Sequence, residues 1–452
     1  MIQITLPSDV KFIIEKLEAA GFEAYAVGGC VRDQIMGREP NDWDITTSAT
    51  PYEVKDIFHK TVDTGLVHGT VTVILHGEGY EVTTYRIDGE YEDGRHPKQV
   101  SFTASLEEDL KRRDFTINAM AYNESHGLVD LFGGLEDLEK GVIRCVGEPM
   151  ERFSEDALRM MRAVRFSAQF GYEIEEATRE AVRKLAPTLE KVSVERIQVE
   201  LTKLLTSGHP DFFRECYELG LTKLFMPEFD ACMTCEQHNP HHAYTVGEHT
   251  LIGMQHVPKD KVLRLTMLLH DIGKVETKTT DEAGIDHFRG HPVKSAEMAK
   301  VILRRLRYDN QTIHDVVRLV EFHDWDIHIE ARKKSVRKAV AKIGQDFFPE
   351  MFEINLADTL AQSDYLRKEK LEKLDALKAL YQEILRDKEC LTLKDLVVNG
   401  QDLMAAGVQP GKQIGQILNA MLQDVLEYPE HNDKEHLLQR VKEFSEGATS
   451  EV

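Results

Sequence analysis

The chain has 452 residues, too many for one hydrophobic core, which predicts about two to four domains. It carries 56 basic and 78 acidic residues, and a formal charge of −22 argues against a scaffold that binds nucleic acid by charge alone. There is no apolar run of roughly 18 residues, so no membrane span is expected. The six scattered cysteines and the start of the chain, which lacks a signal-peptide pattern, predict a cytoplasmic location.

The first 145 residues predict a small sheet covered by helices. Residues 10–21 have the spacing of an amphipathic helix that ends at a glycine, and strand patterns follow at 23–29, 42–47, 70–75 and 80–87. Strand patterns nearly vanish from Pro149 onward, where Ser154 is placed to cap a helix. Residues 238–242 predict a loop before a His-rich helical region, and a long charged helix begins near residue 366. The predicted fold class is α+β.

Two carboxylates in the first part are candidate metal ligands. Asp42 and Asp44 flank Trp43 in a predicted strand, where residues i and i+2 share a face. Two carboxylates on one face can hold Mg²⁺, which would activate a hydroxyl and neutralise a leaving pyrophosphate. Glu81 is a weaker candidate for a third carboxylate. A solvated strand edge is the alternative interpretation of an isolated Asp-X-Asp.

A glycine pair and two arginines are candidates for binding phosphate. Gly28 and Gly29 follow a predicted strand, and a glycine pair lets the backbone approach a triphosphate closely. Arg32 adds a forked charged donor, and Arg113 in the segment RRDFTINAM is within reach of phosphates. The alternatives are a tight strand–helix turn for the glycines and a surface charge cluster for Arg113.

The segment 155–166, EDALRMMRAVRF, predicts a helix with a polar stripe. Asp156, Arg159, Arg162 and Arg165 advance in steps of three residues. Three arginines on a semi-buried helix are costly without an anionic partner; the alternative is a solvated face with an Asp–Arg pair. Asp156 only accepts hydrogen bonds and Arg159 only donates them, so together they fit the amine and ring nitrogen of cytosine or adenine. Guanine and uracil present the reverse order and would be rejected.

In order, the segments GGCVRD, DWD, RRDFTINAM, DLFGG, EDALRMMRAVRF and VERIQVEL resemble the motif set of class II tRNA nucleotidyltransferases and bacterial poly(A) polymerases, over about residues 20–205. The resemblance implies a polymerase-β-like head, a neck that carries a protein template, and helical body and tail domains. It implies that Asp42 and Asp44 bind Mg²⁺. It further implies that the incoming ATP or CTP is contacted by Gly29, Arg32, Arg113, Asp156, Arg159, Arg162 and Arg165. A loop at 86–102, shortened in relatives that add only C, favours addition of CCA or of A.

A second set of residues resembles the HD superfamily of metal-dependent phosphohydrolases. Its members are His249, the doublet His270–Asp271, His291, His323 and Asp358. Imidazole and carboxylate ligands suit Mn²⁺, Ni²⁺, Fe or Mg²⁺, and a bound metal would make a hydroxide for phosphoester hydrolysis. In similar fused enzymes this domain acts as a phosphatase or 2′,3′-cyclic phosphodiesterase, an activity that would clean damaged RNA ends. The alternative is that the helices keep the fold without the metal.

These observations predict an enzyme that adds C, C and A from CTP and ATP to the 3′ end of tRNA, as a monomer or homodimer. Its expected parts are a head at 1–147, a neck and body at 148–236, an HD domain at 237–365 and a tail at 366–452. The competing hypotheses are a poly(A) polymerase and an HD phosphohydrolase whose head only binds RNA.

Overall fold

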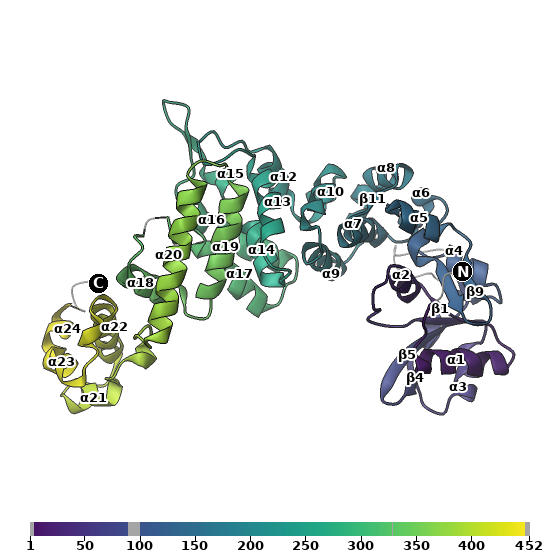
Figure 1. Ribbon diagram of the computed structural model, residues 1–452, viewed down its shortest axis with the longest axis horizontal. Coiled ribbons are helices and arrows are strands. Elements are labelled where there is room, and N and C mark those ends of the chain that lie inside the picture. Colours follow the sequence, from purple (N-terminus) through teal and green to yellow (C-terminus); the bar gives the residue numbers. More distant parts are fainter. Residues whose placement is uncertain (1–3, 89–99, 328, 448–452) are drawn as a thin grey trace. The chain divides into compact units, whose positions relative to one another are not determined.

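A computed structural model describes residues 4–88, 100–327 and 329–447 of the chain. The described residues form two compact units, Met1–Pro227 and Glu228–Val452 (Figure 1). The division into four parts stays a prediction. In the described part of the chain no helix is both long and apolar enough to cross a membrane.

A seven-stranded mixed sheet forms the base of the first unit, in the order β3-β4-β5-β2-β1-β8-β9. The strands are β1 (Ala24–Val27), β2 (Ile45–Thr47), β3 (Thr61–Gly65), β4 (Thr70–Leu75), β5 (Glu78–Thr84), β8 (Met120–Asn123) and β9 (Gly127–Asp130). β2 and β5 pair in parallel, whereas the other neighbours are antiparallel. Two-stranded pairs are formed by β6 (Arg86–Asp88) with β7 (Val100–Phe102), by β10 (Val142–Ile143) with β11 (Glu173–Ile174), and by β12 (Thr279–Thr280) with β13 (Asp286–His287), the last in the second unit.

Helices complete the first unit and confirm the α+β class. They are α1 (Ser8–Ala19), α2 (Gly29–Ile35), α3 (Pro51–Ile57), α4 (Leu106–Lys111), α5 (Gly134–Lys140), α6 (Pro149–Glu155), α7 (Leu158–Phe170), α8 (Glu176–Leu185), α9 (Val194–Leu205), α10 (Phe213–Glu218) and α11 (Thr222–Phe225). The apolar face of α1 buries Val10, Ile13, Ile14 and Leu17, as its helical spacing predicts.

The predicted single helix over 155–166 is wrong, because the chain breaks between α6 and α7. Asp156 is extended, with φ −144° and ψ 104°, and its carboxylate accepts a hydrogen bond from the Leu158 N–H at 3.0 Å. An Asp just before a helix can accept hydrogen bonds from the free N–H groups of its first turn, as Asp156 does for α7. The preceding helix α6 begins at Pro149, a residue favoured at the first helical position. Ser154 is therefore not a cap; it lies within α6 and donates its hydroxyl to the Met150 carbonyl.

The second unit is almost entirely helical. Its helices are α12 (Pro227–Thr234), α13 (Val246–His256), α14 (Lys261–Leu269), α15 (Lys274–Thr277), α16 (His291–Arg305), α17 (Asn310–Phe322), α18 (Lys333–Ile343), α19 (Phe348–Ala361), α20 (Arg367–Arg386), α21 (Gly400–Ala405), α22 (Lys412–Glu427), α23 (Lys434–Gln439) and α24 (Val441–Gly447). Helix α19 packs against both α13 and α20, and α16 packs against α17 (Figure 1). Residues of α18 and α19 share one apolar core with α20, α22 and α23. The tail thus packs on the helices before it.

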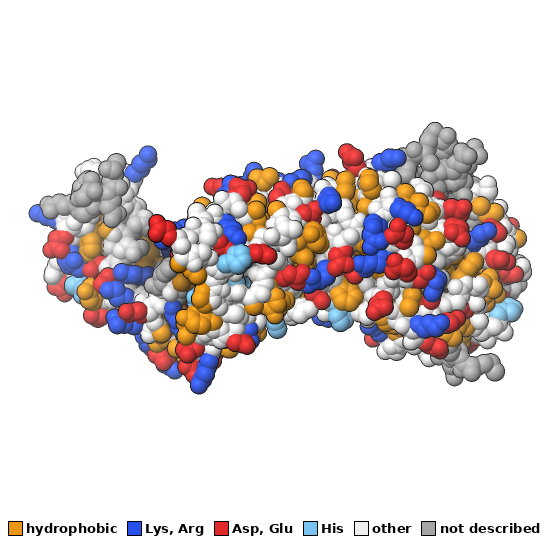
Figure 2. All heavy atoms as spheres, turned by 90° about the horizontal axis from the view of Figure 1, so that it is seen from above, with side chains coloured by type: hydrophobic (Ala, Val, Ile, Leu, Met, Phe, Trp, Pro, Cys, Tyr) orange, Lys and Arg blue, Asp and Glu red, His pale blue; other side chains and the backbone are white. Residues whose placement is uncertain are grey.

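Lys and Arg side chains do not gather into one continuous basic surface on the face drawn in Figure 2. They are interspersed there with Asp and Glu. Many of these charges form ion pairs along or between helices, for example Arg179 with Glu218 at 2.6 Å. Such exposed pairs contribute about 0–1 kcal/mol each, so they shape the local potential more than the stability.

Candidate functional site

Three carboxylates gather where the chain enters β2. Asp42 and Asp44 lie in the segment just before β2, not within a strand as predicted. β2 pairs in parallel with β5, with Ile45 opposite Val82. Asp44 immediately precedes Ile45 and Glu81 immediately precedes Val82, so the two carboxylates occupy matching positions. Desolvation raises the pKa of Asp44, Arg113 lowers it, and the charges of Asp42 and Glu81 raise it further. This crowding of negative charge is suited to a divalent cation.

An arginine side chain packs against the glycine turn between β1 and α2. Gly28 has φ +81°, and a Cβ there would stand 2.8 Å from Nη1 of Arg113. Only glycine combines this backbone conformation with so close a neighbour. Arg113 pairs with Asp109 at 3.6 Å, yet its Nε has no hydrogen-bond partner among the described residues. A charged donor is therefore held against the turn at Gly28, with one buried N–H left unpaired.

Arg32 joins α2 to α7. Its guanidinium is buried, donates to Asn118 Oδ1 at 2.5 Å and pairs with Asp33 at 2.8 Å. It also lies over the rings of Phe166 and Phe170, at 5.3 and 4.9 Å from their centroids. These contacts fix the orientation of α2 relative to α7, while its predicted contact with a nucleotide stays a prediction.

The two predicted template residues both have partners within the chain. Asp156 forms a bidentate pair with Arg196 of α9, at 2.7 and 3.2 Å. Arg159 pairs with Glu155 at 2.6 Å and donates to the carbonyl of Arg112 at 3.1 Å. Asp156 and Arg159 lie at the start of α7, where the break in the helix separates Asp156 from the regular stripe.

Carboxylates of the chain also neutralise the two arginines further along α7. Arg162 donates to Asp114 at 2.7 Å, and Arg165 donates to Glu200 at 2.8 Å. Burial raises the pKa of Asp114, but Arg162 and the Asn118 amide outweigh it and hold the pKa below its ordinary value. The anionic partners that these arginines need are thus present within the chain itself. Its nucleotide contacts stay a prediction.

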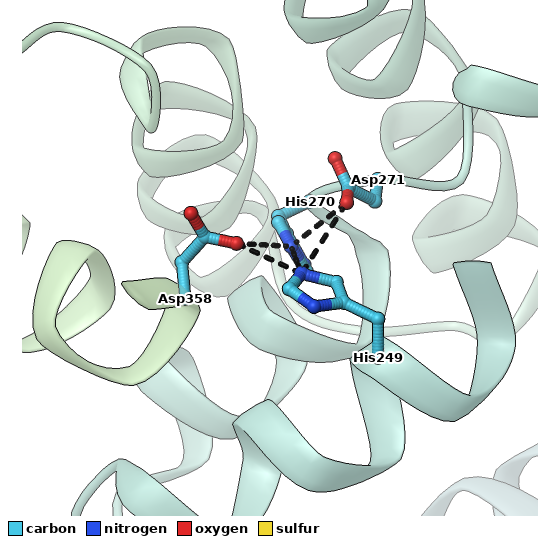
Figure 3. A group of neighbouring side chains, drawn as sticks. All are labelled: His249, His270, Asp271 and Asp358. Carbon is cyan, nitrogen blue, oxygen red and sulfur yellow. Dashed lines mark hydrogen bonds and ion pairs between the residues drawn. The ribbon is translucent and has the colours of Figure 1, made fainter. Parts of the chain in front are cut away.

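In the second unit, the predicted histidines and aspartates come together from five places in the sequence. Figure 3 shows His249 from α13, Asp358 from α19, and the His270–Asp271 doublet after α14 pointing toward one another. His249 Nε2 lies 2.8 Å from Asp358 Oδ1 and 3.3 Å from His270 Nε2. Asp271 Oδ2 lies 3.3 Å from His270 Nε2. This first group consists of the four residues drawn.

A second group shares Asp271 through its other oxygen. His291 Nε2 lies 3.2 Å from Asp271 Oδ1 and 3.2 Å from His323 Nε2. Asp324, which the sequence analysis did not select, lies 3.4 Å from both of these Nε2 atoms through its two oxygens. The signal was present, because residues 323–324 repeat the His-Asp doublet of 270–271.

The hydrogen bonds of the four imidazoles leave their Nε2 atoms free to act as ligands. The Nδ1 atoms of His270, His291 and His323 lie 2.7–2.8 Å from backbone carbonyls, and Nδ1 of His249 lies 3.3 Å from one. A carbonyl accepts only, so each Nδ1 is the donor and each neutral ring presents a lone pair at Nε2. Facing lone pairs at 3.2–3.3 Å repel unless a cation or proton lies between them. The donor set therefore fits a divalent metal.

Asp271 remains ionised despite its burial. Burial alone would raise its pKa, but His270, when it is protonated in place of a bound metal, and the ammonium of Lys274 hold the pKa well below its ordinary value. Lys274 Nζ lies 2.7 Å from Asp271 Oδ2 and also donates to Gln237 at 3.0 Å. An ionised carboxylate with one oxygen in each group can act as a ligand to both.

A cavity of about 820 Å³ opens over these residues. Its floor contains Asp271, His291, His323 and Asp358, and its walls come from 239–242, the loop 285–290 and the start of α20. This volume is in the range of sites that hold a small molecule or the end of a chain.

Comparisons with known proteins place this architecture in a family. Residues 24–144 match the family described as poly A polymerase head domain, residues 171–233 the probable RNA and SrmB-binding site of polymerase A, and residues 291–441 tRNA nucleotidyltransferase domain 2. The fold and the first site thus define a nucleotidyltransferase of the poly(A) polymerase class.

Curated relatives narrow the class further. The CCA-adding enzymes of Ligilactobacillus salivarius and Levilactobacillus brevis are 37% and 39% identical over 99% and 95% of this chain and 99% and 96% of their own length. The CCA-adding enzyme of Leuconostoc mesenteroides is 59% identical over an aligned segment that covers 44% of this chain and 49% of the relative. The crystal structure of the Bacillus stearothermophilus CCA-adding enzyme in complex with CTP is 29% identical, covers 98% of both chains and has a TM-score of 0.69. The chain belongs to the family of CCA-adding enzymes.

Several residues now assigned to the sites were not selected from the sequence. In the first unit, Asp156 pairs with Arg196, Arg162 with Asp114, and Arg165 with Glu200. In the second unit, Asp324 completes the second histidine group. No local pattern marks Arg196, Asp114 or Glu200, because their partners lie 35–48 residues away. Part of the loop at 86–102, namely 89–99, lies outside the described residues.

Proposed function

We propose that this protein adds C, C and A, from CTP and ATP, to the 3′ end of tRNA. The observation that carries the proposal is the grouping of Asp42, Asp44 and Glu81 beside Arg113, in a chain that belongs to the CCA-adding family. The relatives of known structure include a Thermotoga maritima CCA-adding enzyme complexed with tRNA, which supports the same RNA partner through its likeness of fold.

Asp42 and Asp44 would hold Mg²⁺, with Glu81 as a third carboxylate nearby. When bound, the metal lowers the pKa of the attacking 3′-hydroxyl and neutralises the leaving pyrophosphate. Arg113 stands against the glycine turn, where its guanidinium and the backbone of Gly29 would hold the triphosphate. The carboxylates and the guanidinium would thus offer charges of opposite sign to the metal and to the phosphate.

Nucleotide choice would be made by Asp156 and Arg159. For a base to bind there, Asp156 would release or share Arg196, and Arg159 would release or share Glu155. Asp156 accepts from the exocyclic amine, and Arg159 donates to the ring nitrogen beside it. Cytosine and adenine satisfy both groups, whereas uracil and guanine leave buried polar atoms unpaired, which disfavours them strongly.

A primer-extension assay tests this function against its closest competitor. Pure protein with Mg²⁺ is incubated with tRNA lacking its terminal CCA and with CTP, ATP or both. Two additions with CTP alone, and a stop after three with both nucleotides, are expected. A long ladder of A with ATP alone would indicate a poly(A) polymerase instead, and no extension would reject the transferase function.

The geometry of the second unit favours an additional, metal-dependent phosphohydrolase function. We infer that the two histidine groups sharing Asp271 would bind Mn²⁺, Ni²⁺ or Mg²⁺, which when bound supplies a hydroxide for hydrolysis of a phosphoester. Such an activity would free a blocked 3′-hydroxyl on RNA, which the transfer reaction needs. Purified protein that hydrolyses no phosphoester with any of these metals would reject this function.

A further inference from the structure

Besides Lys274, which pairs with Asp271, three cationic side chains line the cavity above the histidine groups. Lys370 and Lys373 come from α20, and Arg289 comes from the loop before α16. Lys370 and Lys373 are three residues apart, so they lie on one face of the helix. Both are half-buried, whereas Arg289 is exposed. The subsite considered below, the α20 subsite, consists of Lys370 and Lys373.

The α20 subsite has no carboxylate partner in the part of the chain that the structure describes. Lys370 Nζ contacts His241 Nδ1 at 3.1 Å and the side-chain oxygen of Gln362. Lys373 Nζ donates to the carbonyls of Asp326 and Ile327 at 2.6 and 3.3 Å. All of these direct partners are neutral groups, so neither ammonium forms a direct ion pair. The carboxylates of Asp358 and Asp326 act on Lys370, and that of Asp326 on Lys373, only at longer range.

Other lysines next to the same cavity are compensated. Lys274 pairs with Asp271 at 2.7 Å, and Lys278 pairs with Asp286 at 2.9 Å. Lys370 and Lys373 differ from these two lysines in having no direct ion pair. Burial lowers the pKa of Lys370, and the charges of Asp358 and Asp326 offset this only in part.

The cavity lining carries charges of both signs. The carboxylates of Asp271, Asp324, Asp326 and Asp358, with the imidazoles, form a set that attracts a cation. Lys370, Lys373 and Arg289 form a set that attracts an anion. A phosphate ester satisfies both, because its reacting phosphate binds the metal while a neighbouring phosphate meets the lysines. The cavity of about 820 Å³ is large enough for more than one phosphate group.

We propose that the α20 subsite binds the phosphate next to the scissile one, so that the second unit acts on the phosphorylated 3′ end of an RNA chain rather than on a free nucleotide. This inference rests on the proposed phosphohydrolase function. In the reaction, water adds its oxygen to phosphorus, and the bond between phosphorus and the 2′ or 3′ oxygen of the sugar breaks. That oxygen takes the proton, which leaves a sugar hydroxyl. Lys370 and Lys373 bind and orient the chain and transfer no proton.

The test compares two substrates in the full-length protein loaded with Mn²⁺ or Ni²⁺. One is a short RNA that ends in a 2′,3′-cyclic phosphate; the other is the corresponding mononucleoside 2′,3′-cyclic phosphate. Replacing both lysines by methionine (Lys370→Met with Lys373→Met) keeps the side-chain length and removes both charges. We expect kcat/KM on the RNA to fall about 10- to 100-fold, as for the loss of charged hydrogen bonds, while the value for the mononucleotide changes less than about threefold.

Lys368→Met provides the matched control. Lys368 lies on the same helix and is 85% exposed, outside the cavity lining. It should leave both substrates unaffected. Equal losses on both substrates, or no loss on either, would overturn the proposed role of the α20 subsite.

A binding measurement separates failure of the subsite from failure of the hydrolase. Calorimetry with a dinucleotide ending in a 3′-phosphate and with the corresponding nucleoside 3′-monophosphate, which lacks the neighbouring phosphate, needs no turnover. The wild-type protein is expected to bind the dinucleotide more tightly, and the double variant is expected to lose that preference. If the wild-type protein hydrolyses neither cyclic phosphate yet shows this change in binding, the hydrolase function fails and the subsite stands. If binding is unchanged in the double variant, the subsite fails whatever the hydrolysis result.

Discussion

Asp44 is a candidate metal ligand whose ionised carboxylate lowers the stability of the folded protein. Desolvation, together with Asp42 and Glu81, raises its pKa in the folded protein, although Arg113 opposes them. A carboxyl with a raised pKa binds its proton more tightly in the folded than in the unfolded state. Its contribution to stability is complete below the ordinary pKa of about 3.9 and is lost as the pH rises through the higher folded pKa. At neutral pH, the ionised Asp44 therefore disfavours folding unless a cation is bound.

Replacing Asp44 by Asn should separate activity from stability. Nucleotide transfer is expected to fall at least about 1000-fold, because one of the metal's ligands is lost. The free energy of unfolding at pH 7 without metal should be unchanged or slightly higher, because an ionised group in an unfavourable place is removed. Primer extension and urea denaturation measure the two effects. Asp63→Asn, at an exposed position in β3, is the control. A stability clearly below that of wild type would contradict the electrostatic argument.

The choice between C and U should depend on the hydrogen-bonding pattern of Asp156. In Asp156→Asn, the amide can donate as well as accept, so it can pair with the uracil carbonyl that a carboxylate rejects. We expect the ratio of kcat/KM for CTP to that for UTP to fall about 10- to 100-fold in single-turnover assays. Glu151→Gln, an exposed change in α6, should leave the ratio unaltered. An unchanged ratio in Asp156→Asn would exclude this carboxylate as the selector.

At the scale of elements, local sequence patterns predicted the positions of helices and strands better than the contacts between them. Alternating and helical spacing located the strands of the head and the helix at 10–21, because these depend on neighbours in sequence. The break at Asp156 went unrecognised, since the i, i+3 stripe is compatible with one helix or two. The histidines and aspartates of the second unit were selected because their order along the chain resembles a known superfamily pattern. The α7 arginines instead find partners in Asp114 and Glu200, which only the tertiary fold brings near.

The packing of α9 on α7 should depend on the buried Glu200. It pairs with the equally buried Arg165, so Glu200→Gln leaves a guanidinium without its counter-charge. Breaking a buried pair in this way is expected to cost about 3 kcal/mol of unfolding free energy. Urea denaturation measures the loss. Glu195→Gln, an exposed change on the same helix, should cost less than about 0.5 kcal/mol. Similar values for the two variants would mean that the pair contributes little to holding the helices together.

At the scale of the whole molecule, each compact unit contains its own candidate metal site. The carboxylates near β2 belong to the first unit, and the histidine groups belong to the second. The helices that carry His323 and Asp358 pack on the same core as α20, so the α20 subsite is held in place by the core beneath the histidine groups. The order of the proposed reactions, hydrolysis of a blocked end and then nucleotide addition, requires no shared residue.

The two activities should therefore be separable by single substitutions. Asp42→Asn is expected to abolish nucleotide addition and leave hydrolysis of a 2′,3′-cyclic phosphate within about twofold of wild type, because the carboxylate belongs only to the first site. Asp358→Asn is expected to do the reverse, since it removes an oxygen that lies 2.8 Å from His249 Nε2. Both activities are measured on each purified variant, with thermal unfolding as a check on folding. Loss of both activities in a variant that unfolds at the wild-type temperature would show that the sites are coupled; independent losses would establish one chain with two separate catalytic centres.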